Sequence, residues 1–168
     1  MSAAQSESSG SSGSVTLSLR LSPIQTLFVN SSQKNIDLVY TDASDYKNGV
    51  TSEQKDHLKI FSTGAFTVNV HSESDDIMQS DGEESISAST LKVKAAPGAS
   101  NALTNATVNE VSLSSSATNL ISSGVGGADR NFNITYSGMG ADAYVNKYYD
   151  HESPTVYSTT VTYTIEAK

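Results

Sequence analysis

Residues 15–21 read Val-Thr-Leu-Ser-Leu-Arg-Leu, a run in which apolar and polar side chains alternate without a break. In an extended chain successive side chains point to opposite faces, so Val15, Leu17, Leu19 and Leu21 share one face. The pattern predicts an amphipathic β-strand. Its apolar face has to be buried against another surface, because exposed apolar area is unfavourable in water.

A second alternating run closes the chain at residues 155–167. Here Tyr157, Val161, Tyr163 and Ile165 fall on one face and threonines occupy the other. Aromatic and β-branched residues of this kind fit a half-buried pleated surface. We therefore expect a terminal β-strand with a buried face.

Between these two runs, short segments of strand character are separated by turn residues. We expect strands at 24–29, 36–41, 58–62, 65–72, 86–96, 108–113, 117–122 and 131–136. Thr63 and Gly64 should join 58–62 and 65–72 as a hairpin. Asn48 and Gly49 mark a tight turn, and Thr51 with Gln54 has the spacing of a capping box for one helical turn.

Strand follows strand without a long helical period, and no repeat of about 20 to 50 residues is present. The expected fold is an all-β, immunoglobulin-like antiparallel sandwich formed by residues 23–168, preceded by an extended strand at 15–22.

The composition limits the functions that the chain can have. With 168 residues, 36% of them hydrophobic and 17% charged, it has room for one domain with a modest core. Its net charge of −8 leaves no basic surface for nucleic acid or anionic membranes. Cysteine is absent, which removes disulfides and thiolate metal sites. No apolar run approaches the about 20 residues that a membrane-spanning helix needs.

The first 14 residues are expected to be a disordered leader rich in Ser and Gly. Small residues precede Gln5 at the positions that a signal peptidase recognises, which makes Gln5 a candidate mature N-terminus. A cloned linker accounts equally well for Ser8 to Ser14, and both explanations stay open.

No motif of a known enzyme class occurs in the sequence. His57 follows Asp56, and His151 lies between Asp150 and Glu152, but both are expected in polar loops with no nucleophile beside them. We interpret them as surface or structural residues and expect no catalytic residues, no cofactor and no enzyme activity.

Two loop features could bind a ligand. The acidic residues between Glu73 and Glu84 could supply oxygen ligands to calcium, although their spacing is not that of an EF-hand and a solvated loop is the simpler interpretation. Tyr148 and Tyr149 form the best candidate for a ligand-facing patch, because tyrosines are common in binding sites. The sequence predicts no metal site, and calcium binding by the acidic stretch stays an open alternative.

The apolar face of residues 15–21 has two alternative destinations. It can complete the sandwich of its own chain as a first strand, or it can add to the edge of a neighbouring subunit. In the second case the backbone of the strand would pair with the exposed edge, and Val15, Leu17, Leu19 and Leu21 would enter the acceptor's core. Seven extended residues span roughly 23 Å, the length of a sandwich.

The chain resembles fimbrial subunits, or pilins, of the chaperone–usher type and related proteins with donor-strand exchange. The features that carry the resemblance are the flexible N-terminus, the VTLSLRL run, the all-strand body and the terminal TVYSTTVTYTIEAK. The resemblance implies that residues 15–22 are a donor strand. It also implies that Tyr157, Val161, Tyr163 and Ile165 lie on the terminal strand that borders the acceptor groove. Many such pilins have a disulfide near the first strand, and this chain lacks it.

Our hypothesis from the sequence is a structural subunit of a surface filament that supports adhesion or biofilm formation. It would form a homopolymer by N-terminal strand addition and be secreted through the periplasm to the cell surface. The resemblance adds a periplasmic chaperone, an outer-membrane usher and a surface receptor as expected partners, without nucleic acid or membrane insertion. The alternative is a self-complemented immunoglobulin-like module that binds a glycan or protein.

Overall fold

The structure is a computed structural model that describes residues 10–149 and 153–168. Its strands are β1 (Gln25–Val29), β2 (Val50–Ser62), β3 (Phe66–Ser72), β4 (Asp76–Met78), β5 (Ser85–Ser87), β6 (Leu91–Pro97), β7 (Thr107–Val108), β8 (Glu110–Ser112), β9 (Thr118–Ser123), β10 (Gly127–Gly138) and β11 (Val161–Ala167). Three short helical segments accompany them: the α-helix α1 (Ala43–Asn48) and the 3-10 turns η1 (Ser31–Gln33) and η2 (Ala88–Thr90).

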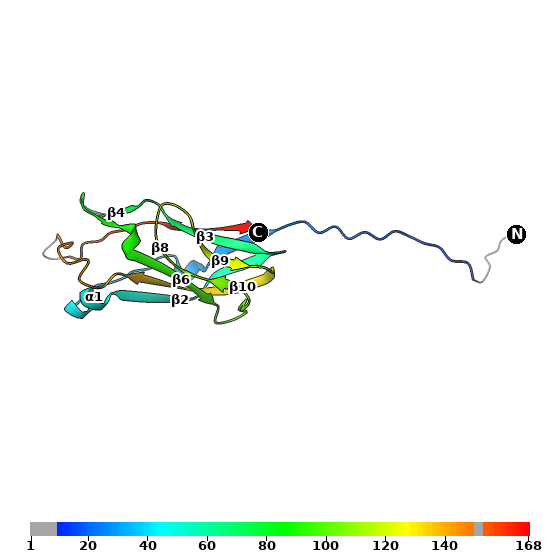
Figure 1. The fold of residues 1–168 in the computed structure, drawn as a ribbon, viewed down its shortest axis with the longest axis horizontal. Coiled ribbons are helices and arrows are strands. Elements are labelled where there is room, and N and C mark those ends of the chain that lie inside the picture. Colours follow the sequence, from blue (N-terminus) through cyan, green and yellow to red (C-terminus); the bar gives the residue numbers. More distant parts are fainter. Residues whose placement is uncertain (1–9, 150–152) are drawn as a thin grey trace.

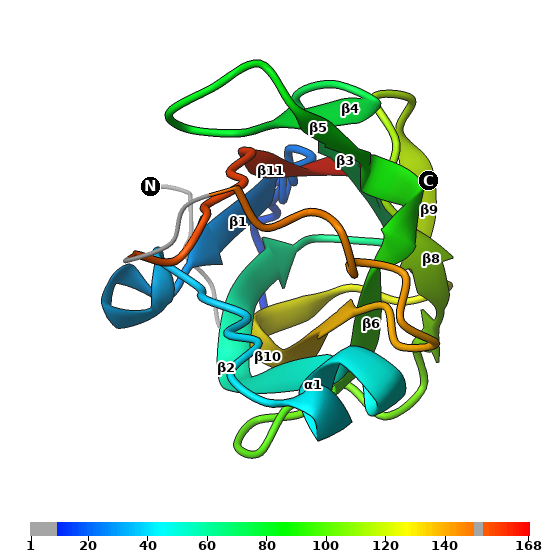
Figure 2. The same cartoon turned by 90° about the vertical axis from the view of Figure 1, so that its left-hand side faces the viewer.

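Two antiparallel sheets form a sandwich (Figures 1 and 2). One sheet has the order β1-β2-β10-β6-β8, the other has the order β11-β3-β9-β7, and β4 pairs with β5 in a separate small ribbon. Leu58, Phe66, Val68, Phe132 and Ile134 fill the space between the sheets and are fully buried. The predicted all-β antiparallel sandwich is confirmed.

The predicted hairpin between 58–62 and 65–72 is wrong. β2 pairs with β1 and β10, whereas β3 pairs with β11 and β9, so residues 63–65 carry the chain from one sheet to the other. The inward positions of Phe66, Val68 and Val70 are confirmed. Two strands with a buried face can meet face to face as readily as side by side, and alternation does not distinguish the two arrangements.

The predicted helical turn at Thr51 to Gln54 is also wrong, because both residues lie in the strand β2. The capping box occurs earlier, where the Asp42 carboxylate accepts from the Asp45 N–H at 3.0 Å and starts α1. The helix ends at Gly49, whose φ of 83° suits glycine. The Asn48–Gly49 turn is therefore a helix end.

β2 contains a bulge that the sequence pattern did not reveal. Asp56 has a φ of 51°, and its N–H donates to the Asn133 Oδ1 atom at 2.7 Å where the register with β10 shifts. β2 has two extra residues here, since Leu58 pairs with Phe132 and Gln54 with Ile134, and both His57 and Leu58 are buried. His57 is therefore buried in a strand and does not lie in a polar loop.

Residues 36–41 are extended, but they form no β-ladder in the described structure, so the predicted strand there is wrong. Ile36 and Leu38 nevertheless pack against the core, as the alternation indicated. The Tyr40 hydroxyl donates to the Met139 carbonyl at 2.9 Å and anchors the end of this segment. Among the described residues, no helix has the length and apolar character to span a membrane.

Candidate functional site

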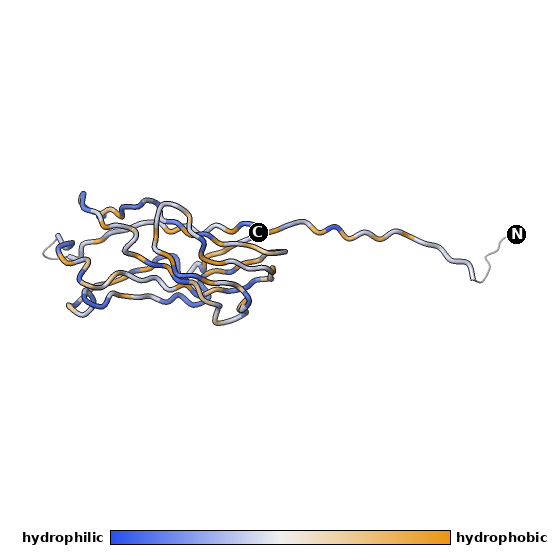
Figure 3. The backbone as a smooth tube through the Cα atoms, in the orientation of Figure 1, coloured by the Kyte–Doolittle hydropathy of each residue, from blue (hydrophilic) through white to orange (hydrophobic). Residues whose placement is uncertain are grey.

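In the part that the structure describes, residues 10–21 do not fold back onto the sandwich. Residues 15–21 extend away from the domain as a single arm (Figure 1), and apolar residues recur along it (Figure 3). Val15 and Leu17 are both 93% exposed, and Leu19 and Leu21 are 85% and 84% exposed. The arm leaves from the end of the sandwich where β1 begins and β11 ends, which we call the proximal end. The opposite end, with α1, is the distal end.

One long side of the sandwich is closed and the other is open. On the closed side, β7 and β8 lie at the edges of different sheets and are joined through Asn109. On the other side, β1 and β11 are edge strands, and each has a single ladder partner in the described structure. These two strands lie next to each other across the sheets (Figure 2). We call this face the open side.

The core is incompletely covered along the open side. The inward side chains of the central strands, such as Val68 and Ile134, are 0% exposed. Those along the open side pack on the core but remain only partly buried, and they are Leu27, Val29, Ile36, Leu38, Tyr157, Val161, Tyr163 and Ile165. The four terminal-strand residues singled out in the sequence are thus part of this row.

Backbone groups point to the open side from the same residues. The Lys168 N–H donates to the Ala65 carbonyl and the Glu73 N–H to the Thr160 carbonyl, both at 3.0 Å. The even-numbered residues from 160 to 168 therefore form the backbone hydrogen bonds with the β3 side. Because pairing alternates along an antiparallel ladder, Val161, Tyr163, Ile165 and Ala167 present their N–H and C=O groups to the open edge.

The same argument applies to β1. The Asn30 N–H donates to the His57 carbonyl at 2.8 Å and the Thr63 N–H to the Ile24 carbonyl at 3.0 Å. Leu27 and Val29 therefore direct their backbone groups away from β2. Two unpaired backbone rows with apolar side chains between them are the features that an added β-strand requires.

A chain of buried polar groups connects the two sheets beneath the open side. His57 Nδ1 lies 2.9 Å from Gln33 Oε1, and His57 Nε2 lies 2.8 Å from the Tyr136 hydroxyl. That hydroxyl lies 2.6 Å from the hydroxyl of Tyr163. Because β2 and β10 belong to one sheet and β11 to the other, these bonds tie the sheets together.

The direction of each hydrogen bond in this network follows from the orientation of Gln33. The Gln33 amide nitrogen donates to the Lys55 carbonyl at 3.0 Å, so its oxygen accepts from His57 Nδ1–H. His57 Nε2 then accepts from Tyr136, and Tyr136 accepts from Tyr163. Burial lowers the pKa of His57 to about 4 and raises the pKa of Tyr136 to about 12. Burial, followed by the neighbouring Tyr136, also raises the pKa of Tyr163. The network is neutral at pH 7.

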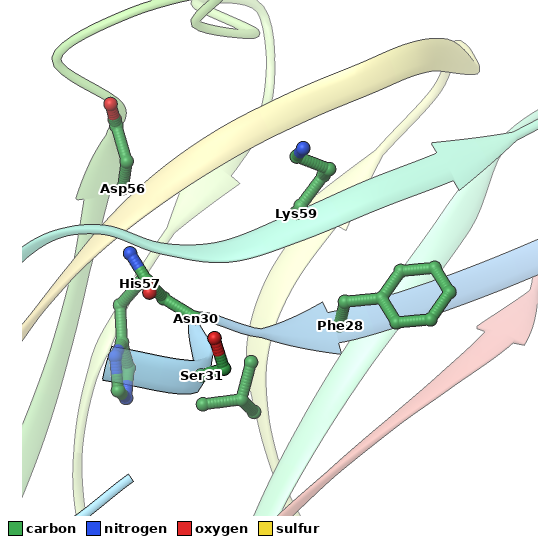
Figure 4. A pocket seen from close by; sticks show the side chains of 7 residues that line it. Phe28, Asn30, Ser31, Asp56, His57 and Lys59 are labelled. Atoms are coloured by element: carbon green, nitrogen blue, oxygen red, sulfur yellow. The ribbon is translucent and has the colours of Figure 1, made fainter. Parts of the chain in front are cut away.

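The histidine and the aspartate that line a hollow beside the end of β1 both take part in hydrogen bonds. Figure 4 shows its lining: Phe28, Val29, Asn30, Ser31, Asp56, His57 and Lys59. Both ring nitrogens of His57 are already bonded. The Asp56 carboxylate accepts from the Ala99 N–H at 2.7 Å and the Ser100 hydroxyl at 2.8 Å. These contacts fix the bulge and a loop.

The other candidates lie at the distal end or outside the described residues. Tyr148 and Tyr149 are 48% and 49% exposed in the loop between β10 and β11. In the acidic stretch, Asp75 accepts from the Ser115 N–H at 2.7 Å and Glu84 from the Tyr149 hydroxyl at 3.1 Å. No group of three or more potential metal ligands occurs in residues 10–149 and 153–168. His151 lies outside this part, as does the leader up to residue 9.

Comparison with known proteins gave no match: neither a protein-family model nor a curated protein sequence is similar to this chain.

Proposed function

We propose that the chain is a structural subunit of an extracellular filament, in which residues 15–21 of one copy fill the open side of the next. The observation that carries this proposal is the presence on one molecule of an exposed apolar arm and of a row of only partly buried apolar side chains along the open side. The arm supplies seven alternating residues, and β11 supplies a seven-residue edge.

The proposed direction of insertion follows from where the arm leaves the domain. β11 runs from the distal to the proximal end. If the donor strand runs antiparallel to β11, its Leu21 lies at the distal end of the acceptor copy. The donor's own domain follows directly after Leu21, so the proximal end of the donor copy contacts the distal end of the acceptor copy. A head-to-tail contact of this kind can repeat from copy to copy, and it yields a filament when the rotation between successive copies does not close a ring. A donor parallel to β11 would bring two proximal ends together, which permits a closed, reciprocal dimer.

The proposed register aligns the arm and β11 end to end. Leu21 then lies opposite Val161, Leu19 opposite Tyr163, Leu17 opposite Ile165 and Val15 opposite Ala167. Each pair combines an apolar arm residue with an inward-facing residue of the edge strand, except that Ala167 is exposed. Burial of four such side chains contributes several kcal/mol, at about 1.5 to 3 kcal/mol for each fully buried one.

This assembly suits secretion through the periplasm to the cell surface, with a chaperone and an usher that cover the open side before polymerisation. Adhesion or biofilm formation, through a surface receptor, is the role that such a filament would have. These partners belong to the proposal and follow from the resemblance of the sequence to pilins.

Engineered disulfides test the proposal, because the chain has no cysteine of its own. In the proposed register Arg20 lies opposite Thr162, both facing solvent, at the about 4.5 Å Cα separation of a non-hydrogen-bonded pair. The variant Arg20→Cys/Thr162→Cys is expected to give a ladder of covalent oligomers on non-reducing gels. The matched control Thr16→Cys/Thr162→Cys keeps the same acceptor cysteine and is expected to give no ladder.

The two variants separate the alternatives. An arm folded into its own domain has to turn back at residues 22–24 and would run parallel to β11, with Thr16 beside Thr162. A monomeric disulfide in the Thr16→Cys/Thr162→Cys variant would therefore show self-complementation and contradict the proposal. Electron microscopy provides the second readout, with filaments expected from the full chain and none from a chain that lacks residues 14–22.

A further inference from the structure

Phe28 on β1 is 63% exposed, but most of the exposed large apolar side chains of the domain lie at its two ends. At the distal end they are 47–51% exposed and comprise Met78, Met139, Val145, Tyr148, Tyr149 and Val156. We call this group the distal cap. At the proximal end Ile24 is 48% exposed and Val125 is 47% exposed. We propose that the distal cap is a second contact between copies, which receives the proximal end of the subunit whose arm fills the open side.

Hydrogen bonds tie the described residues on both sides of the distal cap to the sandwich. The Tyr144 hydroxyl lies 2.7 Å from Thr90 Oγ1, and Lys147 Nζ donates to the Ser85 carbonyl at 3.1 Å. The Tyr157 hydroxyl donates to the Lys147 carbonyl at 2.8 Å. Apolar groups held in place in this way lose little conformational entropy on contact, which favours a binding surface.

The cap also contains a hollow that a protruding side chain could enter. It lies between the turn 79–84 and residues 154–156, and its lining is Gln79, Ser80, Asp81, Tyr149, Pro154, Thr155 and Val156. A bond of 3.1 Å from the Tyr149 hydroxyl to Glu84 Oε1 holds one wall. The turn that lines the hollow, between β4 and β5, lies at the distal end of the sandwich (Figure 1).

The proposed function, on which this inference rests, also indicates which part of the neighbouring copy contacts the distal cap. With Leu21 at the distal end of the acceptor, Ser22, Pro23 and Ile24 of the donor copy lie immediately beyond it. Ile24 is rigidly placed, since its N–H donates to Thr63 Oγ1 at 2.9 Å and its carbonyl accepts from the Thr63 N–H. The apolar group nearest to the arm is therefore presented to the apolar cap.

Charge supports the same pairing. Arg20 is the only charged residue between positions 10 and 33, and it lies next to the last apolar residue of the arm. The distal turn carries Asp81, Glu83 and Glu84. Antiparallel insertion brings the cation to the acidic end of the acceptor, whereas parallel insertion would place it at the other end. Opposite charges at a contact favour the correct orientation on encounter.

The test measures the critical concentration for polymerisation of the full chain. Val145→Asp/Tyr148→Asp places two charges in the cap, and Thr107→Asp adds an exposed charge at the closed side as a control. All chains also carry Ser18→Cys/Thr164→Cys, which reports insertion of the arm as a covalent ladder. The cap variant is expected to raise the critical concentration about tenfold and to shorten the filaments, while the ladder still forms at high concentration.

Each outcome decides between the two proposals. A cap variant that polymerises like the Thr107→Asp control would overturn the second contact and leave the filament proposal standing. Failure of the parent chain to give either filaments or a ladder would overturn the filament proposal, and this inference with it. Circular dichroism of each monomer shows that a loss of filaments does not come from unfolding.

Discussion

Replacing Leu17 and Leu19 with aspartate is expected to abolish filament formation while the folded domain stays intact. Both side chains are at least 85% exposed in the free subunit, so the change costs the monomer almost nothing. In the polymer each carboxylate would enter an apolar core without a partner, at a cost of several kcal/mol per group. The measurement is electron microscopy together with sedimentation of polymer at equal protein concentrations.

Ser18→Asp is the matched control, because Ser18 lies between the two leucines on the polar face of the arm. It adds a negative charge to the same seven residues and is expected to leave filaments unchanged. Loss of filaments in Ser18→Asp as well would mean that charge anywhere on the arm prevents assembly, and would contradict burial of one face. Unchanged filaments in Leu17→Asp/Leu19→Asp would refute a role for the arm altogether.

The second large effect concerns the polar chain beneath the open side. Tyr136→Phe is expected to lower the free energy of unfolding by about 2 to 4 kcal/mol, because it leaves His57 Nε2 without a donor and the Tyr163 hydroxyl without an acceptor. Urea unfolding at pH 7.5 measures the loss. A loss below about 1 kcal/mol would mean that the two groups find other partners.

The same network makes stability depend on pH. The folded pKa of His57 is lowered from 6.5 to about 4, so the unfolded chain binds a proton more readily than the folded one. The stabilisation is complete above pH 6.5 and declines as the pH falls towards 4. Between pH 7.5 and 5 the loss should be about 2 kcal/mol in the native chain. His57→Gln should remove most of this dependence, and His71→Gln, which changes a histidine outside the network, should retain it.

The strands could be predicted from the sequence wherever one face is buried. Phe66, Val68 and Val70, and likewise Phe132, Ile134 and Tyr136, alternate with polar residues and point into the core as expected. Alternation records which face is buried and carries no information on which strand lies alongside. The crossing at 63–65 was therefore mistaken for a hairpin, and the extended residues 36–41 for a paired strand.

His57 and its partners were beyond a pattern-based prediction for a different reason. Its inward position depends on the bulge at Asp56, where β2 has two more residues between Gln54 and Leu58 than β10 has between Ile134 and Phe132. The signal for that bulge lies in tertiary contacts from Asn133, Ala99 and Ser100 to Asp56, 43 to 77 residues away in sequence. The alternating apolar face of residues 15–21, in contrast, was evident from the sequence, although alternation left open whether that face is buried in its own domain or extends from it.

Every copy has one arm and one open side, and this determines how many arms and open sides stay unoccupied in a filament. In a filament of n subunits there are n arms and n open sides but only n − 1 joints. One terminal subunit therefore keeps a bare arm, and the subunit at the opposite terminus keeps an uncovered core. The two termini of the proposed filament would be chemically different, so such a filament would have a direction. A chain without residues 14–22 can accept an arm but offer none, and when mixed with full-length chains it should act as a terminator at one end of the filament only.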